Sequence, residues 1–245
     1  MIAVVAQFLR NPSGGFIAPN AASEGAPKAV SRRNTENFNT GEILRTPHFY
    51  LMYVMFVSVA TGGLAITGQA GPIAKEWGFE AVLASAIALP QIANGISRIL
   101  WGSVSDRMGR ENTMAISFGL QALCLLSVLM IGKTSPTMFI VTLILTYFTY
   151  GQVFALFPAT LGDYFGGRNA TSNNALLYTS KGVASLLAGY VAALMFVTFK
   201  SWSPMFYGSA ILALIAAIGA LVLRTMPLPK RAAAAGPVTA GVSPG

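Results

Sequence analysis

Residues 49–71 read FYLMYVMFVSVATGGLAITGQAG, an apolar run of 23 residues that contains no charged side chain. A helix needs about 20 such residues to cross a hydrocarbon core about 30 Å thick. Because that core holds no water, every backbone N–H and C=O group must find a partner within the protein, and a helix provides one for each. The run therefore predicts a membrane-spanning helix.

Five further runs of similar length and composition follow the first one. They lie at residues 82–104, 113–132, 137–161, 174–198 and 204–223, and short links rich in charged and turn-forming residues separate them. A closed β-barrel would read as alternating segments of about ten residues, and the chain shows no such alternation. We therefore expect an all-α membrane protein with six transmembrane helices, packed as one bundle over residues 48–226.

The composition of the whole chain agrees with membrane embedding. Apolar residues make up 54% of the 245 residues and charged residues only 10%, whereas soluble domains carry about 25% charged residues. The high hydrophobicity excludes a disordered protein, and a single cysteine, Cys124, excludes a disulfide scaffold. We expect the lipid bilayer as a partner and no nucleic acid, because the excess of 16 basic over 8 acidic residues follows the membrane topology.

The basic residues between the spans are divided unevenly between the two sides of the predicted bundle. One side has only Lys75, Lys133 and Lys200, and the other side has ten: Lys28, Arg32, Arg33, Arg45, Arg107, Arg110, Arg168, Arg224, Lys230 and Arg231. Lys and Arg collect on the cytosolic side of membrane proteins. We therefore expect a multi-pass protein of the cell (inner) membrane with both ends in the cytosol.

The two ends of the chain differ in character from the spans. Residues 1–10 are apolar but too few to cross a bilayer, and we interpret them as the remnant of a preceding transmembrane helix. Residues 11–47 are rich in Gly, Pro, Ala, Asn and Ser, which is typical of a flexible cytosolic linker. Residues 227–245 are rich in Pro, Ala and Gly and predict a disordered cytosolic tail.

The link between the second and third spans reads GSVSDRMGR from Gly102 to Arg110. Gly102 would permit close helix contact, Asp106 would accept from a helix terminus or an Arg, and Gly109 would relax a tight turn. An ordinary charged loop on the cytosolic side would explain the same residues. In its setting the motif, which includes Arg107, resembles the G-x-x-x-D-R-x-G-R loop of the major facilitator superfamily, which follows the second helix of each six-helix half.

That resemblance also indicates which half of such a fold the chain represents. The linker and helix remnant ahead of the first span are similar to the central loop that joins the two halves. The basic tail after the last span is similar to the C-terminus of the superfamily. The resemblance therefore implies the C-terminal half of a twelve-helix major facilitator fold, with a missing N-terminal six-helix half as its partner.

Further segments resemble one group within that superfamily, the oxalate/formate antiporter family. They are Phe38–Tyr50 at the entry to the first span, Phe154–Ala159 and Asp163–Gly166 in and after the fourth, and Tyr178–Gly182 in the fifth. The resemblance covers residues 38–231. It implies secondary active transport by alternating access, in which small carboxylates are exchanged and oxalate for formate is the type reaction.

Two cations lie inside the predicted spans, Arg98 in the second and Lys181 in the fifth. Each costs about 2.5–3.5 kcal/mol near a helix centre, and none of the eight acidic residues lies well inside a span. Helical spacing puts Arg98 on one polar stripe with Gln91 and Asn94. The residues thus predict a cationic site without an internal counterion, suited to a small carboxylate anion. The alternative is that both side chains snorkel to the cytosolic interface.

Tyr150 and Phe154 lie one helical turn apart in the fourth span and therefore share a face. Packing or lipid contact would explain such a pair equally well. In the oxalate/formate antiporter family, an Arg of helix eight and a Lys of helix eleven bind the substrate and aromatic residues of helix ten line the site. The resemblance therefore implies that Arg98, Lys181, Tyr150 and Phe154 bind the substrate. Phe154 carries no hydroxyl, so any polar contact that relatives make there is absent.

Two other functions fit the same residues. One is a proton-coupled transporter of monocarboxylates such as lactate or pyruvate within the same superfamily, and the other is a truncated half-carrier that does not transport. The chain contains no nucleophile–base pair, phosphate-binding loop or cluster of metal ligands. We therefore expect no enzyme activity, no metal and no cofactor.

Overall fold

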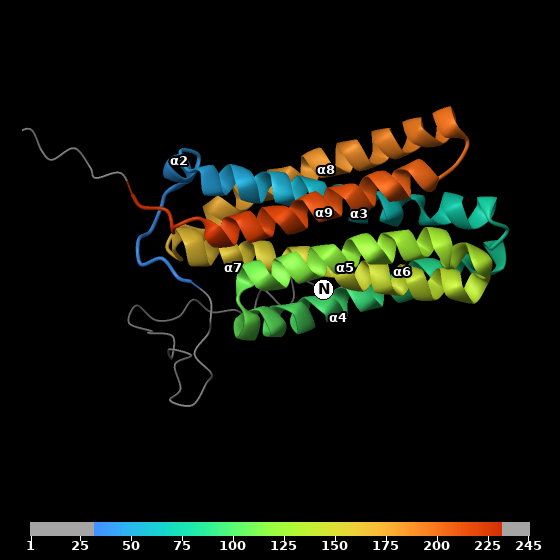
Figure 1. The fold of residues 1–245 in the computed structure, drawn as a ribbon, viewed down its shortest axis with the longest axis horizontal. Helices are drawn as coiled ribbons and strands as arrows, with labels where there is room; N and C mark the ends of the chain where they lie inside the picture. The colour runs from blue at the N-terminus through green and yellow to red at the C-terminus, as the bar shows by residue number, and fades with distance from the viewer. Residues whose placement is uncertain (1–31, 232–245) are drawn as a thin grey trace, which may run out of the picture.

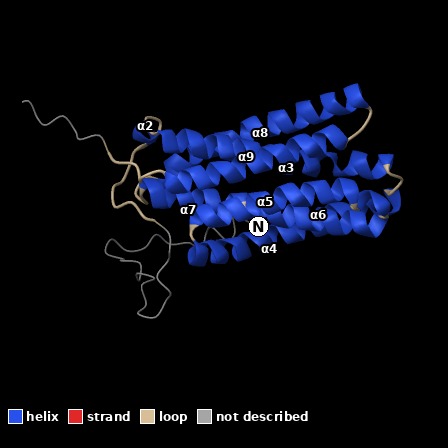
Figure 2. Cartoon of the chain, viewed as in Figure 1, coloured by secondary structure: helices blue, strands red, loops and turns tan. Residues whose placement is uncertain are grey.

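The computed structural model of the protein describes residues 32–231. The expected helix remnant at residues 1–10, the linker ahead of residue 32 and the tail beyond residue 231 lie outside the described residues. Between residues 32 and 231 all regular structure is helical, with no strand (Figure 2). The expectation of an all-α protein is thereby confirmed.

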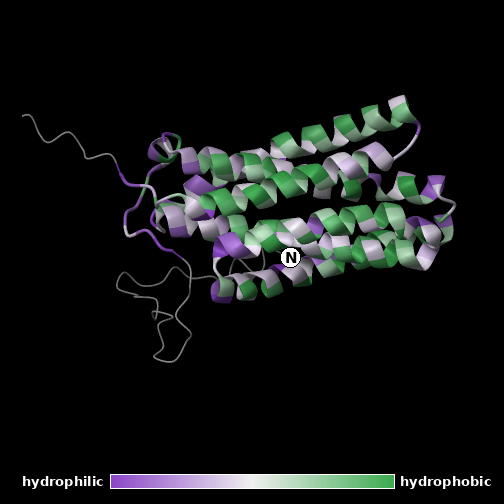
Figure 3. Cartoon of the chain, viewed as in Figure 1, coloured by the Kyte–Doolittle hydropathy of each residue, from purple (hydrophilic) through white to green (hydrophobic). Residues whose placement is uncertain are grey.

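All six expected spans are present as long apolar helical segments that lie side by side along the long axis of the molecule, and the fourth consists of two consecutive helices (Figure 1). Hydrophobic residues dominate the helices along their length, and hydrophilic residues gather at the two ends of the bundle (Figure 3). The helices are α2 (Thr40–Ile43), α3 (Pro47–Glu76), α4 (Leu83–Met108), α5 (Arg110–Met130), α6 (Pro136–Gly151), α7 (Val153–Phe165), α8 (Ala170–Phe199) and α9 (Ser203–Thr225), with short 3-10 turns at Glu80–Val82 and Gly132–Thr134.

Proline and glycine mark several helix ends. Pro47, Pro136 and Pro204 stand in the first turns of α3, α6 and α9, where their missing N–H would have had no intrahelical partner. Gly109 and Gly166 end α4 and α7 with φ angles of 89° and 81°. Side chains are strained at such angles, so glycine permits both sharp turns.

The bundle consists of two groups of three spans. In one group α3 packs against α8 and α9, in the other α6 packs against α4 and α5, and the contact between α5 and α9 joins the groups. Phe157 of α7 stacks against Phe56 of α3 and Phe118 of α5, with ring centroids 4.6 and 5.9 Å apart. These buried rings fix α7 between the two groups.

The fourth span, expected as one continuous helix, is instead broken in its middle. Helix α6 ends at Gly151 and α7 begins at Val153, while the backbone N–H of the intervening Gln152 is directed at the Tyr150 carbonyl. A Cβ atom at Gly151 would collide with Ser97 of α4. The close approach of α4 therefore coincides with the break, and hydropathy alone carries no signal for it.

Residues 32–46, the α4–α5 and α7–α8 connections and residues 226–231 lie together at one end of the bundle, on the left in Figure 1, which we call the basic end. Asn34 Nδ2 donates to the Pro229 carbonyl at 2.7 Å, and Arg231 Nε pairs with Glu42 Oε1 at 2.7 Å. A capping box between Asn39 and Glu42 starts α2. The described parts of the expected flexible linker and disordered tail therefore have defined contacts, because their polar side chains bind free backbone groups and each other.

Candidate functional site

The two cations expected inside the spans meet on one aromatic ring. The Arg98 guanidinium carbon, from α4, lies 4.5 Å from the centroid of the Phe154 ring. The Lys181 ammonium nitrogen, from α8, lies 4.9 Å from the same centroid. Phe154 stands in the first turn of α7, directly after the break in the fourth span. Helices α4 and α8 thus bring two positive charges to one ring, which α7 provides.

Neither cation has a carboxylate partner among residues 32–231. The hydrogen bond that Arg98 makes is to a neutral group, with Nη2 donating to Asn94 Oδ1 at 3.1 Å. Contact with an aromatic face stabilises a cation, but it does not neutralise the charge. The two side chains therefore give the site a formal charge of +2, which suits an anion with two negative groups.

Tyr150 completes the aromatic side of the site. Its ring meets that of Phe154 edge to face, with centroids 5.6 Å apart. On its other side the ring is pressed against Gly63 of α3, where a Cβ atom would overlap it. The Tyr150 hydroxyl is buried and has no hydrogen-bond partner in the described part of the chain. The predicted pair of Tyr150 and Phe154 therefore shares one face across the helix break, and the Tyr150 hydroxyl has no partner among the described residues.

The site opens toward the outside of the bundle. Arg98 is exposed, and Lys181 and Phe154 are half-buried. The spans that carry the cations are also the least covered. In an apolar stretch of 18 residues, 22% of the residues are buried in the span Glu80–Met108 and 17% in Ala170–Phe199, against 67% in Pro47–Glu76. A charged side chain inside a membrane span is costly when it faces lipid. This face of the bundle is therefore suited to contact with protein or water.

Asn94 belongs to the site although its role was not predicted. The polar stripe on the second span placed Asn94 on the same face as Arg98, and the four-residue spacing was the signal for a contact. Gln91, from the same stripe, makes no hydrogen bond to Arg98 in the described structure. Periodicity identified the face, and the packing against α6 decided which residue of that face is buried.

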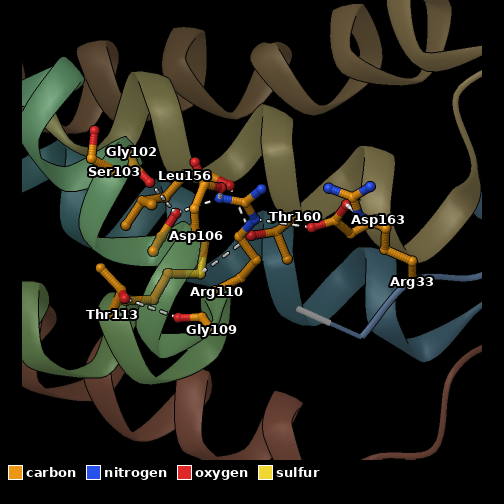
Figure 4. Close-up of polar contacts among 12 residues, drawn as sticks. Arg33, Gly102, Ser103, Asp106, Gly109, Arg110, Thr113, Leu156, Thr160 and Asp163 are labelled. Atoms are coloured by element: carbon orange, nitrogen blue, oxygen red, sulfur yellow. Dashed lines mark hydrogen bonds and ion pairs between the residues drawn. The ribbon is translucent and has the colours of Figure 1, made fainter. Parts of the chain in front are cut away.

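A second charged cluster lies at the basic end, where the loop motif meets α7 (Figure 4). Arg110 pairs with Asp106 at 2.7 Å and with Asp163 of α7 at 2.9 Å. Its Nη1 also donates to the Ser105 hydroxyl, and Arg33 reaches Asp163 at 3.3 Å. The motif thus holds α4, α5 and α7 together through ion pairs.

The remaining motif residues have separate positions. Gly109 supplies the positive φ angle of the turn, as expected. Arg107 is exposed and forms no ion pair among the residues that the structure describes. The close helix contact expected at Gly102 is not formed in this structure, since no atom of the described residues would lie within 4 Å of a Cβ there. The charges, rather than Gly102, hold this end together.

Comparison with known proteins gives one family and several relatives. The sequence model of the Major Facilitator Superfamily matches this chain twice, over residues 4–188 and over the overlapping residues 50–244. The oxalate:formate antiporter of Oxalobacter formigenes is 33% identical over 218 residues, which cover 88% of this chain and 52% of that protein. The uncharacterized MFS-type transporter YhjX of Escherichia coli (strain K12) is 25% identical over 153 residues, 62% of this chain and 38% of that protein.

A third relative is the apicoplast pyruvate carrier 2 of Toxoplasma gondii, 30% identical over 91 residues, which cover 37% of this chain and 14% of that protein. The chain thus spans about half or less of the length of the curated relatives it matches. All three relatives have names that describe transporters.

Proposed function

The chain belongs to the major facilitator superfamily, and on that premise we propose that Arg98 and Lys181 bind the two ends of a small dicarboxylate, with oxalate as the favoured ligand. Tyr150 and Phe154 form the aromatic wall of the same site. Exchange of oxalate for formate by alternating access is the proposed activity of the transporter to which these six helices contribute.

The observation that carries the proposal is the meeting of two cations on the Phe154 ring, neither of them paired with a carboxylate of residues 32–231. Their charges lie no further apart than the sum of their distances from the ring centre, so each raises the energy of the other until an anion binds. An Arg binds a carboxylate through two parallel hydrogen bonds, and a Lys acts as a mobile point charge. The likeness to the oxalate:formate antiporter supports the same ligand class.

The exposed position of Arg98 supports a further part of the proposal, that a second six-helix bundle covers the face formed by α4 and α8. Proteoliposomes that hold this chain alone should then show no oxalate uptake above protein-free vesicles, since alternating access needs both walls of the site. Saturable oxalate exchange by this chain alone would contradict the proposal that transport requires a second bundle of different sequence.

We further propose that the six spans cross the cell inner membrane and that the basic end lies on the cytosolic side. Of the described Lys and Arg residues outside the site, three lie at the opposite end, Lys75, Lys133 and Lys200, and nine at the basic end: Arg32, Arg33, Arg45, Arg107, Arg110, Arg168, Arg224, Lys230 and Arg231. This asymmetry is the one that the positive-inside rule associates with cytosolic loops. Labelling of an introduced Ser103→Cys from one side of intact cells tests the orientation.

The second candidate function is the transport of a monocarboxylate with proton coupling. The likeness to a pyruvate carrier favours it. In that case one of the two cations would bind the single carboxylate of the substrate. Competition separates the two candidates: a dicarboxylate site prefers oxalate over pyruvate, whereas a monocarboxylate site reverses that order.

The binding test uses the purified chain in lipid nanodiscs, because all four side chains of the site belong to it. We expect Arg98→Gln and Lys181→Gln each to weaken oxalate binding by orders of magnitude in titration calorimetry. Lys75→Gln is the matched control, since Lys75 is an exposed cation at the opposite end of the bundle. Wild-type oxalate affinity in both site variants would mean that the cations only snorkel, and would overturn the proposal.

A further inference from the structure

Asn94 makes two contacts that the proposed site does not require. The residue is 6% exposed. Its Oδ1 accepts from Nη2 of Arg98 at 3.1 Å, and its Nδ2 donates to the backbone carbonyl of Tyr147 at 3.2 Å. One buried amide therefore connects the cation of the site to the last turn of α6.

Helix α4 is attached to that last turn at two further points. Trp101 Nε1 donates to the Phe148 carbonyl at 3.1 Å, and the absence of a side chain at Gly151 lets Ser97 lie against the backbone there. Asn94 and Trp101 are two turns apart on one face of α4. Of these attachments, the one through Asn94 is the one that also reaches the anion site.

Arg98 makes the corresponding contact on the other side of the break. Its guanidinium lies on Phe154, in the first turn of α7. Arg98 and Asn94 thus bridge α7 to α6 around Gln152. The Gln152 amide is fully buried, and neither of its polar atoms has a partner within residues 32–231. A buried amide without partners destabilises the arrangement that contains it. Within the described residues, the Gln152 side chain therefore contributes no hydrogen bond that would stabilise the break.

We propose that Asn94 is a positioning residue that holds the Arg98 guanidinium over Phe154 and transmits carboxylate binding at Arg98 to the α6–α7 break. This inference rests on the proposed anion site. A carboxylate that draws Arg98 away from Phe154 or from Asn94 removes one side of the bridge, and the angle between α6 and α7 is then free to change. Asp163, which pairs with Arg110, lies about 14 Å along α7 from Phe154, so the change reaches the basic end.

The first measurement is oxalate affinity of the chain in nanodiscs. Asn94→Leu removes both hydrogen bonds at similar side-chain volume, and we expect it to raise the oxalate Kd about tenfold or more, because hydrogen bonds to charged groups are the stronger ones. Asn94→Asp gives Arg98 a resident carboxylate that competes with the ligand, so its Kd should rise further. Trp101→Phe is the matched control: it removes the other α4 side-chain donor at the end of α6 without touching Arg98, and its Kd should stay within about twofold of wild type.

The second measurement reports the coupling, which a purely structural role would not produce. With Cys124, the single cysteine, replaced by Ser, spin labels are attached at Ser103 and Gly167, both exposed at the basic end. Oxalate should change the distance distribution between the labels when Asn94 is present. The change should persist in Trp101→Phe and be absent in Asn94→Leu at saturating oxalate.

The outcomes separate this inference from the proposed function. Wild-type oxalate affinity in Arg98→Gln would overturn the proposed site and this inference with it. Loss of binding in Arg98→Gln, together with wild-type affinity and a normal distance change in Asn94→Leu and Asn94→Asp, would overturn the inference alone. Equal losses in Asn94→Leu and Trp101→Phe would also overturn it, because they would reflect general damage to the α4–α6 contact.

Discussion

Arg98 and Arg110 are twelve residues apart in the sequence, and their surroundings are opposite. The Arg110 side chain is 10% exposed and lies between two carboxylates, those of Asp106 and Asp163. Arg98 is exposed on an aromatic ring beside a neutral amide and a second cation. The first is an ion-pair cluster that is complete within the chain. The second is a cationic pair whose anion has to come from outside, and this difference separates a structural cluster from a binding site.

The largest expected effect is on oxalate binding when Lys181 loses its charge. Lys181→Gln leaves one carboxylate of the dianion desolvated and unpaired, which costs on the order of 3–5 kcal/mol. Lys181→Arg keeps the charge with another shape and should retain partial binding. Formate has one carboxylate and should lose less affinity in one of the two variants Arg98→Gln and Lys181→Gln. Competition titrations measure this, and equal losses for both anions in both variants would contradict a two-ended site.

The next effect concerns the stability of the basic end. Asp163→Asn breaks the ion pair with Arg110, and we expect it to lower the free energy of unfolding by about 2–4 kcal/mol, because both side chains are largely buried. The oxalate Kd should change by less than about tenfold, since coupling through packed elements is worth about 0.5–2 kcal/mol. Denaturation in detergent gives the first quantity and calorimetry the second. Arg107→Gln is the control, as Arg107 is exposed. A larger effect of Asp163→Asn on oxalate binding than on stability would contradict the distinction between a structural cluster and a binding site.

A smaller effect distinguishes two glycines of the same loop motif. Gly109 has a φ angle of 89°, so Gly109→Ala should destabilise the protein by about 1–2 kcal/mol through backbone strain. Gly102 lies within α4, where Gly102→Ala should be neutral or stabilising by about 0.5–1 kcal/mol. Thermal unfolding of the two variants side by side measures both. Destabilisation by Gly102→Ala would point to a helix contact that forms in another state of the protein.

The smallest effect is that of pH on the exposed ion pair between Glu42 and Arg231. The backbone N–H of Asn39 donates to the Glu42 carboxylate and holds its pKa below the usual value, and Arg231 acts in the same direction. A lowered pKa in the folded state means that this contact stabilises at neutral pH and is lost as pH falls through the lowered pKa. A spin label at Leu228→Cys should therefore become more mobile in acid, and Glu42→Gln should show that mobility already at neutral pH. Unchanged mobility in Glu42→Gln would mean that the ion pair does not hold this segment.

Several features of the site could be predicted because they depend on local spacing. The four-residue intervals from Asn94 to Arg98 and from Tyr150 to Phe154 placed each pair on one helix face, and the structure shows both contacts. The break at Gln152 could not be predicted, because an apolar run reads the same whether the helix is continuous or interrupted. It coincides with the close approach of α4 at Gly151, which is a tertiary contact.

The sequence by itself determined the class of protein, the number of spans and the residues that cannot face lipid. Each of these follows from the free energy of transferring a segment into hydrocarbon, which depends on composition and length and very little on neighbours. Only the tertiary structure decided that Phe154 lies against both Arg98 and Lys181, while Arg110 lies against Asp163. Those partnerships depend on the rotation and lateral packing of α4, α5, α7 and α8, and periodicity within one helix contains no information about how that helix is turned toward another.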